Sequence, residues 1–246
     1  MHPVIFKFGP ITIYSYGLMI FIAVIVCFNL LSKEAKRLGY DKDAIFDLGF
    51  VILFSGIIGA RLLYVLLNLG FYLKNPKEIF MFAHGGLAIF GGIIVATIVA
   101  FVFMKFKRLP FFSTLDLIAP FVALGQSIGR IGCLLNGCCY GFPCKIGFYF
   151  PVHDAVLFPT QLLSSFLLLV LYIVLRVGQG RPHATGMIFT SYILYYSVMR
   201  FFIEFIRADS PRLFLNLTIF QYFSFVLFVF GLILSYGIKW KKRISK

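Results

Sequence analysis

The sequence is poor in charge, holds a single tryptophan and has no polar linker. Only 13% of its 246 residues are charged, while 61% are hydrophobic. A soluble domain of this size could not hide so much apolar surface from water, which excludes one soluble globular domain. No Gly/Ser linker, low-complexity tract or obvious repeat interrupts the chain, so we expect one transmembrane domain over residues 1–246. The lack of an inverted repeat also leaves a small-solute transporter without support.

Seven apolar stretches are long enough to cross a membrane. A helix rises 1.5 Å per residue, so roughly 20 residues cross the hydrocarbon layer. The first stretch has no small-residue cleavage site after it, so we expect it to stay in the mature protein. We predict an all-α integral membrane protein, a bundle of seven transmembrane helices. The predicted spans cover approximately residues 13–31, 44–67, 87–104, 115–135, 160–175, 185–206 and 217–238.

The basic residues indicate how the bundle is oriented. Of 23 Lys and Arg residues, fourteen lie in loops on one side of the predicted membrane and six on the other. Because cytoplasmic loops carry the excess of positive charge, this bias places the C-terminus in the cytoplasm and the N-terminus outside. The formal charge of +14 therefore reflects topology, and no nucleic-acid partner is expected.

The segment at residues 125–141, GQSIGRIGCLLNGCCYG, is the most unusual part of the chain. It places Arg130 inside an apolar span, where a charge is costly and is kept for a purpose. Glycines at positions 125, 129 and 132 recur at i, i+4 and i+7, which clears a groove on one helix face for a backbone or a lipid tail. We expect this segment to face an anionic partner.

A second set of charged residues lies at the C-terminal end of the sixth predicted span. Arg200, Glu204 and Arg207 recur at i, i+4 and i+7, so they share one helix face. A guanidinium presents a planar fork that suits phosphate oxygens, and a carboxylate between two guanidiniums can fix their geometry. The alternative is a structural ion-pair ladder with one end reaching water. Together with the other arginines inside spans, the pattern favours a phosphate-binding cavity.

Two further candidates lie in the first half of the chain. Arg61 in the second span can face the same cavity, or it can be a structural tie to Asp116 or Glu204. His84 precedes two Gly-Gly pairs, Gly85-Gly86 and Gly91-Gly92, which let a backbone approach a ligand. A histidine there can act as a general base near neutral pH, or it can be an ordinary interfacial residue.

Four cysteines fall within twelve residues of a predicted external loop. Outside the cytoplasm a disulfide is permitted, whereas the spacing Cys-x4-Cys-Cys-x4-Cys matches no familiar zinc pattern. Soft side chains packing a glycine-rich turn, a metal site and a catalytic thiol are the other interpretations. The four residues are Cys133, Cys138, Cys139 and Cys144.

At these positions the chain resembles the bacterial prolipoprotein diacylglyceryl transferase family. The family signature is approximately Gly-Arg-x-Gly-Asn-Phe-x-Asn-x-Glu-x-x-Gly, and residues 129–141 are GRIGCLLNGCCYG. The resemblance covers nearly the whole chain. The matching positions are Tyr16-Gly17, Ala60-Arg61-Leu62, the two Gly-Gly pairs, Gly129, Arg130, Gly132, Asn136, Gly141, residues 159–162 (PTQL), Arg200, Glu204 and Arg207.

The chain also departs from the family pattern. Cys133 and Cys138 stand where the signature has asparagine and glutamate, and Phe90 stands where the family has its functional histidine. His84 is nearby but is not the matching residue. The usual Tyr-Glu pair after residues 159–162 is Leu163-Ser164 here, and the external loop is short.

The resemblance implies transfer of the diacylglyceryl group from phosphatidylglycerol to the lipobox cysteine thiol of prolipoproteins, forming a thioether and releasing glycerol 1-phosphate. Its partners would be phosphatidylglycerol, prolipoprotein signal peptides and membrane lipids, with no metal or organic cofactor. It implies a multi-pass protein of the bacterial cytoplasmic (inner) membrane with its active site toward the outer leaflet. The expected catalytic residues are Arg130, Arg200, Glu204 and His84, and the expected substrate-binding residues are Arg130, Tyr16, Arg61, Asn136, Gly141 and Arg207.

Two other functions compete with this one. A diverged phospholipid-binding or lipid-handling membrane protein would keep the phosphate cavity without the transfer chemistry, and Phe90 at the histidine position motivates it. A redox membrane protein would use Cys138-Cys139. The sequence leaves open the general base, the redox state of the cysteines, the acyl-chain preference and the oligomeric state.

Overall fold

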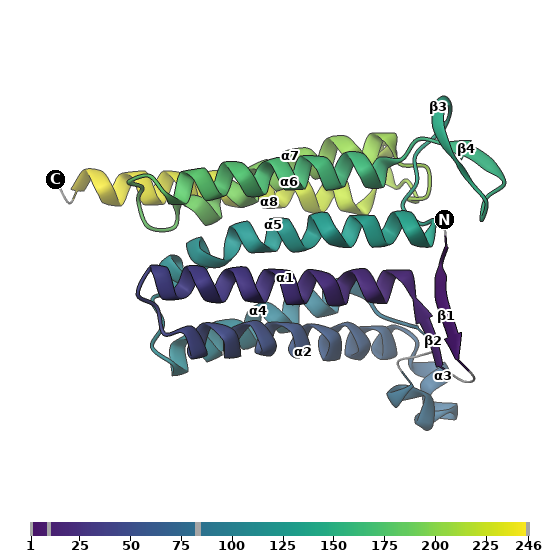
Figure 1. Ribbon diagram of the computed structural model, residues 1–246, viewed down its shortest axis with the longest axis horizontal. Helices are drawn as coiled ribbons and strands as arrows, with labels where there is room; N and C mark the ends of the chain where they lie inside the picture. The colour runs from purple at the N-terminus through teal and green to yellow at the C-terminus, as the bar shows by residue number, and fades with distance from the viewer. Residues whose placement is uncertain (1, 9–10, 82–84, 245–246) are drawn as a thin grey trace. The chain divides into compact units, whose positions relative to one another are not determined.

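The fold is mostly helical (Figure 1). The computed structural model describes residues 2–8, 11–81 and 85–244. In chain order its elements are β1 (Val4–Phe8), β2 (Ile11–Tyr14), α1 (Ser15–Arg37), α2 (Lys42–Leu67), α3 (Leu69–Lys74), a 3-10 helix (Pro76–Phe80), α4 (Ile89–Phe106), α5 (Phe111–Asn136), β3 (Pro143–Phe150), β4 (Ala155–Leu157), α6 (Thr160–Gln179), α7 (Met187–Ile206), a second 3-10 helix (Phe214–Asn216) and α8 (Ile219–Ile244).

Each of the seven predicted spans coincides with a long helix. Within the described residues, six of these helices are long and apolar enough to cross a membrane, namely α1, α2, α4, α5, α6 and α8. The exception is α7, which carries Arg200, Glu204 and the tyrosines Tyr192, Tyr195 and Tyr196. These polar groups lower its hydropathy. Six of the seven predicted spans are therefore helices that could cross a membrane by length and composition, and the count of seven crossings stays a prediction.

The prediction of a purely α-helical fold is wrong in one respect, because two antiparallel hairpins are present. β1 pairs with β2, and β3 pairs with β4. Residues 13 and 14, predicted to open the first span, belong to β2, so α1 begins at Ser15. The loop after α5 folds back as the second hairpin because Phe148, Tyr149 and Phe150 pair with residues 155–157.

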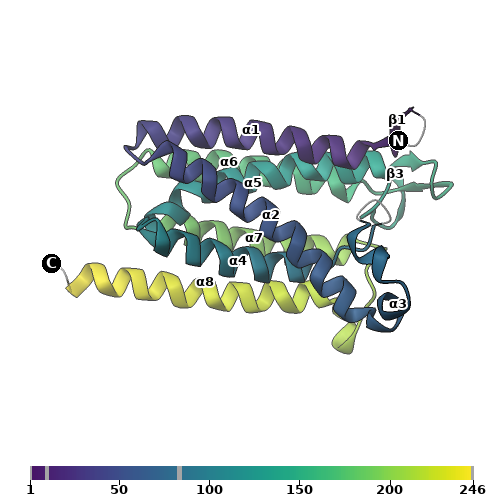
Figure 2. The same cartoon turned by 90° about the horizontal axis from the view of Figure 1, so that it is seen from below.

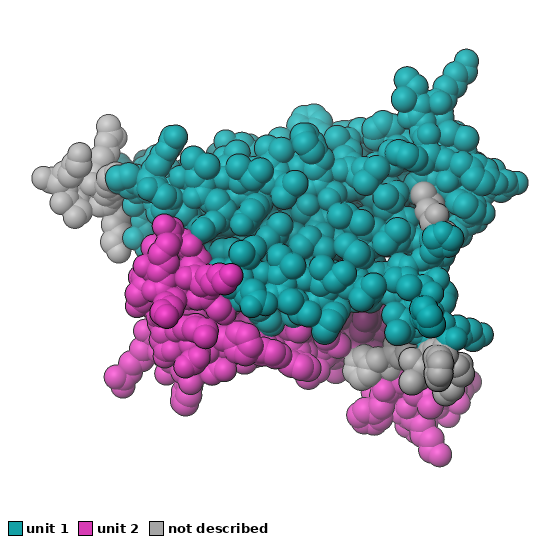
Figure 3. Space-filling model, in the orientation of Figure 1, with its two compact units in different colours: residues 1–30, 112–246 teal, residues 31–111 magenta. Residues whose placement is uncertain are grey.

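The chain divides into two compact units (Figure 3). Unit 1 consists of residues 1–30 and 112–246, and unit 2 consists of residues 31–111. The expectation of one domain over the whole chain stays a prediction.

The core of unit 1 lies where α5, α6 and α7 pack together. Ala119 and Ala123 of α5 lie against Leu171 and Leu175 of α6 and Ile188 of α7. Small residues on α5 let the neighbouring helices approach closely, as is common between membrane helices.

A reciprocal hydrogen-bonded pair joins α5 to α6. The hydroxyl of Ser127 donates to the Ser165 carbonyl at 2.8 Å, and the hydroxyl of Ser165 donates to the Ser127 carbonyl at 2.9 Å. Both serines are buried, so each satisfies a polar group that would otherwise be costly in an apolar surrounding.

The groove predicted from the glycines of α5 is occupied by the first part of α1. A Cβ at Gly125 would lie 3.4 Å from the Cys27 sulfur, and one at Gly132 would lie 3.0 Å from Met19 Cβ and 3.2 Å from a ring carbon of Tyr16. The close approach that the spacing predicted is therefore confirmed, with a helix as the partner.

At the start of α8, Thr218 and Gln221 form a reciprocal cap. The Thr218 N–H donates to the Gln221 side-chain oxygen at 2.8 Å, and the Gln221 N–H donates to the Thr218 hydroxyl at 3.4 Å. The Gln221 amide also donates to the Phe201 carbonyl of α7 at 3.4 Å. This capping box fixes the first turn of α8 against α7.

Unit 2 is built on a close crossing of α2 and α4. A Cβ at Gly59 would lie 2.6 Å from the Gly91 carbonyl oxygen, and one at Gly92 would lie 2.9 Å from the Gly56 carbonyl oxygen. The second Gly-Gly pair was expected to admit a ligand, but these glycines instead allow α4 to approach α2.

Asp41 caps the start of α2 by accepting the N–H groups of residues 43 and 44.

Both units expose large apolar side chains. Ile58 of α2 is 60% exposed and Ile233 of α8 is 65% exposed. Such surfaces suit a hydrocarbon solvent and would be unfavourable in water.

Candidate functional site

The charged face predicted on α7 exists, and it is buried. Arg200 Nη2 lies 2.9 Å from Glu204 Oε2, and Arg207 Nη1 lies 3.3 Å from the same oxygen. The Glu204 side chain is inaccessible to solvent, and both guanidiniums are almost fully buried. One carboxylate oxygen thus holds two arginines, as the spacing of four and three residues predicted.

The aromatic ring of Phe220, in α8, contacts both Arg200 and Arg207. The ring centroid lies 4.8 Å from Arg200 Cζ and 5.8 Å from Arg207 Cζ. A cation over an aromatic face is attracted to it, so the ring helps to hold two like charges side by side. Phe220 was not predicted, because it is one of 32 phenylalanines and has no distinguishing neighbours in the sequence.

Asp209 is a second unpredicted member of the site. Its two oxygens accept from Arg207 Nε at 2.9 Å and from Arg207 Nη2 at 3.0 Å, a bidentate pair. Burial opposes the charge of Arg207, yet the pKa of Arg207 is raised because Asp209 accepts these bonds and because the negative charges of Cys139 and Glu204 lie nearby. Arg207 is therefore held by carboxylates on both sides.

Arg200 and Arg130 keep hydrogen-bonding capacity that no group among the described residues uses. Arg200 Nη1 is buried without a hydrogen-bond partner among the described residues, and so is Glu204 Oε1. Arg130, half-buried on α5, has no hydrogen bond or ion pair within the part of the chain that the structure describes. The charge of Arg130 is close enough to interact with those of Arg200 and Cys139. Like charges gathered around unsatisfied N–H donors are an arrangement that an anion would stabilise.

Tyr16 and Asn136 lie beside this cluster. The Tyr16 ring packs against Gly132 on α5, its side chain is partly exposed, and its phenol is within electrostatic reach of Arg130. Asn136 ends α5, and its side chain lies near the Cys138 thiol. Both residues can offer neutral hydrogen bonds at the edge of the arginine cluster.

The loop after α5 is tied to α6 and to the end of α7. The Gln161 amide donates to the Cys138 carbonyl at 2.6 Å, and Thr160 donates to the Cys139 carbonyl. The Cys139 N–H donates to Asp209 Oδ2 at 3.0 Å. Gly141 pairs with Arg207 in an isolated bridge, and a Cβ on it would lie 3.0 Å from the Ile206 carbonyl oxygen. Gly141 therefore positions the loop through its backbone.

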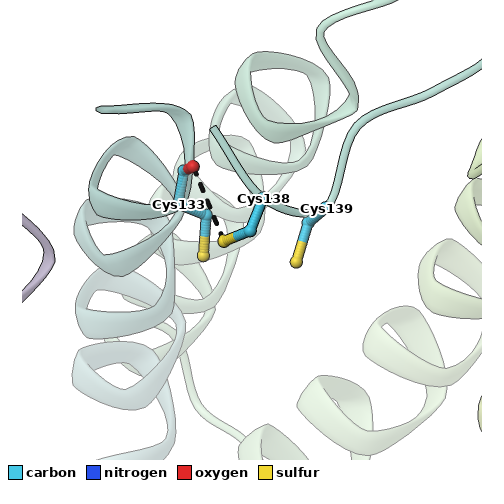
Figure 4. Close-up of side chains that lie close together, drawn as sticks. All are labelled: Cys133, Cys138 and Cys139. Carbon is cyan, nitrogen blue, oxygen red and sulfur yellow. Dashed lines mark hydrogen bonds between the residues drawn. The ribbon is translucent and has the colours of Figure 1, made fainter. Parts of the chain in front are cut away.

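Three of the cysteines predicted for this loop gather in space (Figure 4). The sulfur atoms of Cys133, Cys138 and Cys139 all lie within 4.8 Å of one another, whereas Cys144 is not in the group. All five cysteines of the chain are free thiols in the structure. The structure therefore does not contain the disulfide that the sequence allowed. Hydrogen bonds from the Cys133 and Cys138 thiols, and the nearby charges of the arginines, lower the pKa of the Cys139 thiol below its usual range.

His153 is a further residue near the loop that the sequence did not single out. Its Nε2 lies 2.9 Å from the Gly137 carbonyl oxygen, and its ring lies 4.1 Å from that of Tyr140. Nothing in its local sequence marks it, because it is brought to the loop by the β3–β4 hairpin.

Arg61 lies in unit 2 with its donors already engaged. Its guanidinium donates to the carbonyls of Glu78, Ile79, Met81, Gly85 and Gly86. The ring of Tyr72 lies 5.4 Å from its Cζ. Arg61 is therefore a structural tie, although its acceptors are backbone carbonyls and not the carboxylates that the sequence analysis considered.

His84, the predicted general base, lies outside the described residues. Phe90, the residue expected from the resemblance to replace a histidine, lies in the first turn of α4.

Comparison with known proteins identifies the family. The model of the family described as prolipoprotein diacylglyceryl transferase matches residues 3–236. A phosphatidylglycerol–prolipoprotein diacylglyceryl transferase of Clostridium tetani (strain Massachusetts / E88) is 35% identical over 239 residues, covering 94% of this chain and 96% of that protein. The enzyme of the same name from Finegoldia magna is 36% identical over 250 residues, covering 100% and 98%. That of Streptococcus pyogenes serotype M3 is 33% identical over 255 residues, with the same coverage.

The match is continuous, and it includes both the arginine cluster and the cysteine-bearing loop. Six helices among its described residues are long and apolar enough to cross a membrane, and the chain is a multi-pass membrane protein. It belongs to the prolipoprotein diacylglyceryl transferase family.

Proposed function

We propose that this chain transfers the diacylglyceryl group of phosphatidylglycerol to the lipobox cysteine of prolipoproteins, with Arg130 and Arg200 binding the phosphate. The observation that carries the proposal is the buried Nη1 of Arg200, which has no partner within the described residues, and the charge of Arg130 nearby, for which these residues likewise offer no acceptor. The guanidiniums of Arg130, Arg200 and Arg207 outnumber the carboxylates of Glu204 and Asp209. The phosphodiester of phosphatidylglycerol is an anion, so it can accept hydrogen bonds from the donors of Arg130 and Arg200.

The reaction makes one bond and breaks one. The substrate thiol loses its proton, and the thiolate sulfur attacks the glyceryl carbon that carries the phosphate. The carbon–oxygen bond to phosphate breaks with its electron pair on oxygen, which gives a thioether and glycerol 1-phosphate. Negative charge grows on the departing phosphate, so guanidiniums fixed around it stabilise the transition state more than the ground state.

The other arginine and the two carboxylates have positioning roles. The guanidinium of Arg207 donates its hydrogen bonds to Glu204 and Asp209, so it orients Glu204 and the loop after α5. Glu204 in turn fixes the guanidinium of Arg200. Tyr16 and Asn136 supply neutral hydrogen bonds to the headgroup. Arg61 donates to five backbone carbonyls of unit 2, so we assign it a structural role there and not the substrate-binding role that the resemblance implied.

The proton of the substrate thiol has two possible destinations. His84 is the predicted general base. The alternative is that the positive potential of the arginine cluster lowers the pKa of the substrate thiol, so that no protein base is required.

The arginine cluster belongs to the outer side of the membrane in this proposal. The site lies at the end of unit 1 that carries the β3–β4 hairpin, and the C-terminal end of α8 lies at the opposite end (Figures 1 and 2). The basic residues of the chain end, such as Lys239, mark that opposite end as cytoplasmic. This orientation requires seven crossings. In this proposal α7 is the seventh, although its buried charges lower its hydropathy below that of the other six helices.

A second function is favoured by one observation. Phe90 stands where the family has its histidine, so a chain that binds phospholipid without transferring its diacylglyceryl group would keep the arginine cluster and lose only the chemistry.

Complementation tests the proposal. We would express the chain in a bacterium depleted of its own diacylglyceryl transferase and follow the mobility shift of a reporter lipoprotein. We expect lipidation by the wild type and by Arg181→Ala, which removes an exposed arginine as a matched control. Absence of lipidation with confirmed membrane insertion would contradict the transferase proposal and support the lipid-binding alternative.

A further inference from the structure

The three gathered cysteines make a compact all-sulfur donor set that the transfer reaction does not use. Cys133 comes from the last turn of α5, while Cys138 and Cys139 come from the loop that follows (Figure 4). All three side chains are half-buried. Neighbouring side chains of an extended strand point to opposite faces, but Cys139 has a φ of +62°, and this left-handed turn brings both thiols of the pair to Cys133.

We propose that Cys133, Cys138 and Cys139 bind one thiophilic d10 cation, zinc(II) or copper(I). Metal–thiolate bonds of ~2.3 Å place the sulfurs about 3.8 Å apart in a tetrahedral site and about 4.0 Å apart in a trigonal one. The three sulfurs already lie within 4.8 Å of one another, so closing on an ion requires shifts of less than about 1 Å. Calcium and magnesium are excluded because they require oxygen ligands.

The surroundings support a thiolate-bound ion. Three thiolates bound to a monovalent or divalent cation carry a net negative charge. Arg130 and Arg207 lie close enough to the Cys139 sulfur to offset that charge.

The ion would hold the loop that orients the arginine cluster. Cys139 donates its N–H to Asp209, and Asp209 holds Arg207. Cys138 accepts through its carbonyl from Gln161. Joining Cys133 to both residues would therefore fix the end of α5 against the loop. This consequence rests on the proposed function, whereas the binding of the ion does not.

Metal content is the first test. The full chain, purified in lipid nanodiscs under reducing conditions, would be loaded with zinc(II) in one arm and copper(I) in the other, desalted and measured by mass spectrometry of the metal. We expect about one equivalent of at least one ion in the wild type and in Cys27→Ser/Cys144→Ser, which keeps the three clustered thiols. We expect less than a tenth as much in Cys133→Ser/Cys138→Ser/Cys139→Ser. No retained ion in the wild type, or equal retention in the triple variant, would overturn the proposal.

Alkylation of the wild type tests the same site without any variant. With the ion bound, maleimide should modify Cys133, Cys138 and Cys139 at least tenfold more slowly, while Cys27 and Cys144 react at unchanged rates. Equal rates with and without the ion would contradict the site. A disulfide between two of the three cysteines, found in acid-quenched chain taken directly from cells, would also contradict it. Neither readout depends on transfer, so a failed complementation leaves this test intact.

Discussion

Two buried arginines in apolar helices show how differently a membrane protein can treat the same charge. Arg61 in α2 donates to five backbone carbonyls of its own unit. Arg200 in α7 meets one carboxylate oxygen and an aromatic ring, and its Nη1 has no partner among the described residues. A guanidinium has five N–H donors, so Arg61 is saturated and Arg200 is not. We therefore interpret the saturated arginine as a structural residue and the unsaturated one as the residue proposed to bind the phosphate.

Replacing Arg130, the second unsaturated arginine, should have the largest effect on transfer. Arg130→Ala should lower the rate of transfer by about 10²- to 10³-fold, because a guanidinium that stabilises the leaving phosphate is lost. The measurement is glycerol phosphate release from phosphatidylglycerol by purified chain in nanodiscs. Arg181→Ala is the control, and near-normal turnover of Arg130→Ala would exclude a role for Arg130 in phosphate binding.

Removing the saturated arginine should have the opposite effect. Arg61→Ala leaves five carbonyls without their donor, so the free energy of unfolding should fall by about 3 kcal/mol, measured by thermal denaturation in detergent. The fraction that remains folded should turn over within a few-fold of the wild type. Arg61→Lys, which keeps three donors, should lie between the two. A stable Arg61→Ala protein with strongly reduced turnover would move Arg61 into the phosphate site.

The close helix crossing of unit 2 gives a purely structural reference. At Gly59 a Cβ would lie 2.5 Å from Val95 Cβ and 2.6 Å from the Gly91 carbonyl oxygen. Gly59→Ala should therefore cost about 1–3 kcal/mol of stability by overpacking. Gly237→Ala on α8 is the matched control, since a Cβ there meets nothing within 4 Å. Equal melting temperatures for the two variants would show that α2 and α4 separate more easily than the structure implies.

Replacing Asp209 should have the smallest effect on transfer. The result distinguishes a residue that positions the arginines from one that binds the lipid. Asp209→Asn weakens the bidentate bond to Arg207 and should reduce transfer about tenfold, a change of about 1.4 kcal/mol. Because Arg207 does not contact the phosphate in this account, kcat should fall while the affinity for phosphatidylglycerol changes little. A loss confined to KM would place Arg207 in direct contact with the lipid.

The sequence could predict the helices and the charged face of α7, because both follow from local periodicity. Arg200, Glu204 and Arg207 recur at helical spacing, and the glycines of α5 at the same spacing marked its contact with α1. Asp209 could have been found, since it lies two residues after Arg207 on a segment that leaves the helix. Its signal is weak because the geometry beyond a helix end is not periodic.

The rest depends on tertiary contacts that leave no local pattern. Phe220 is selected by its place under two arginines. Backbone carbonyls satisfy Arg61, and a carbonyl acceptor can belong to any residue type. The hairpin at β3 and β4 brings His153 to Gly137 across sixteen residues. The gathering of Cys138 and Cys139 with Cys133 requires the left-handed turn at Cys139, a conformation that sequence spacing alone does not reveal.

Binding of glycerol 1-phosphate tests the central claim most directly, because it asks only whether an unsaturated arginine holds phosphate. The measurement is isothermal titration of the wild type, Arg200→Ala and Arg61→Ala in nanodiscs, each corrected for its folded fraction. We expect Arg200→Ala to weaken binding at least tenfold, since a charge-assisted hydrogen bond contributes about 1.5–3 kcal/mol, and we expect Arg61→Ala to bind like the wild type. Equal affinity of the wild type and Arg200→Ala, or a loss in Arg61→Ala as large as in Arg200→Ala, would contradict it.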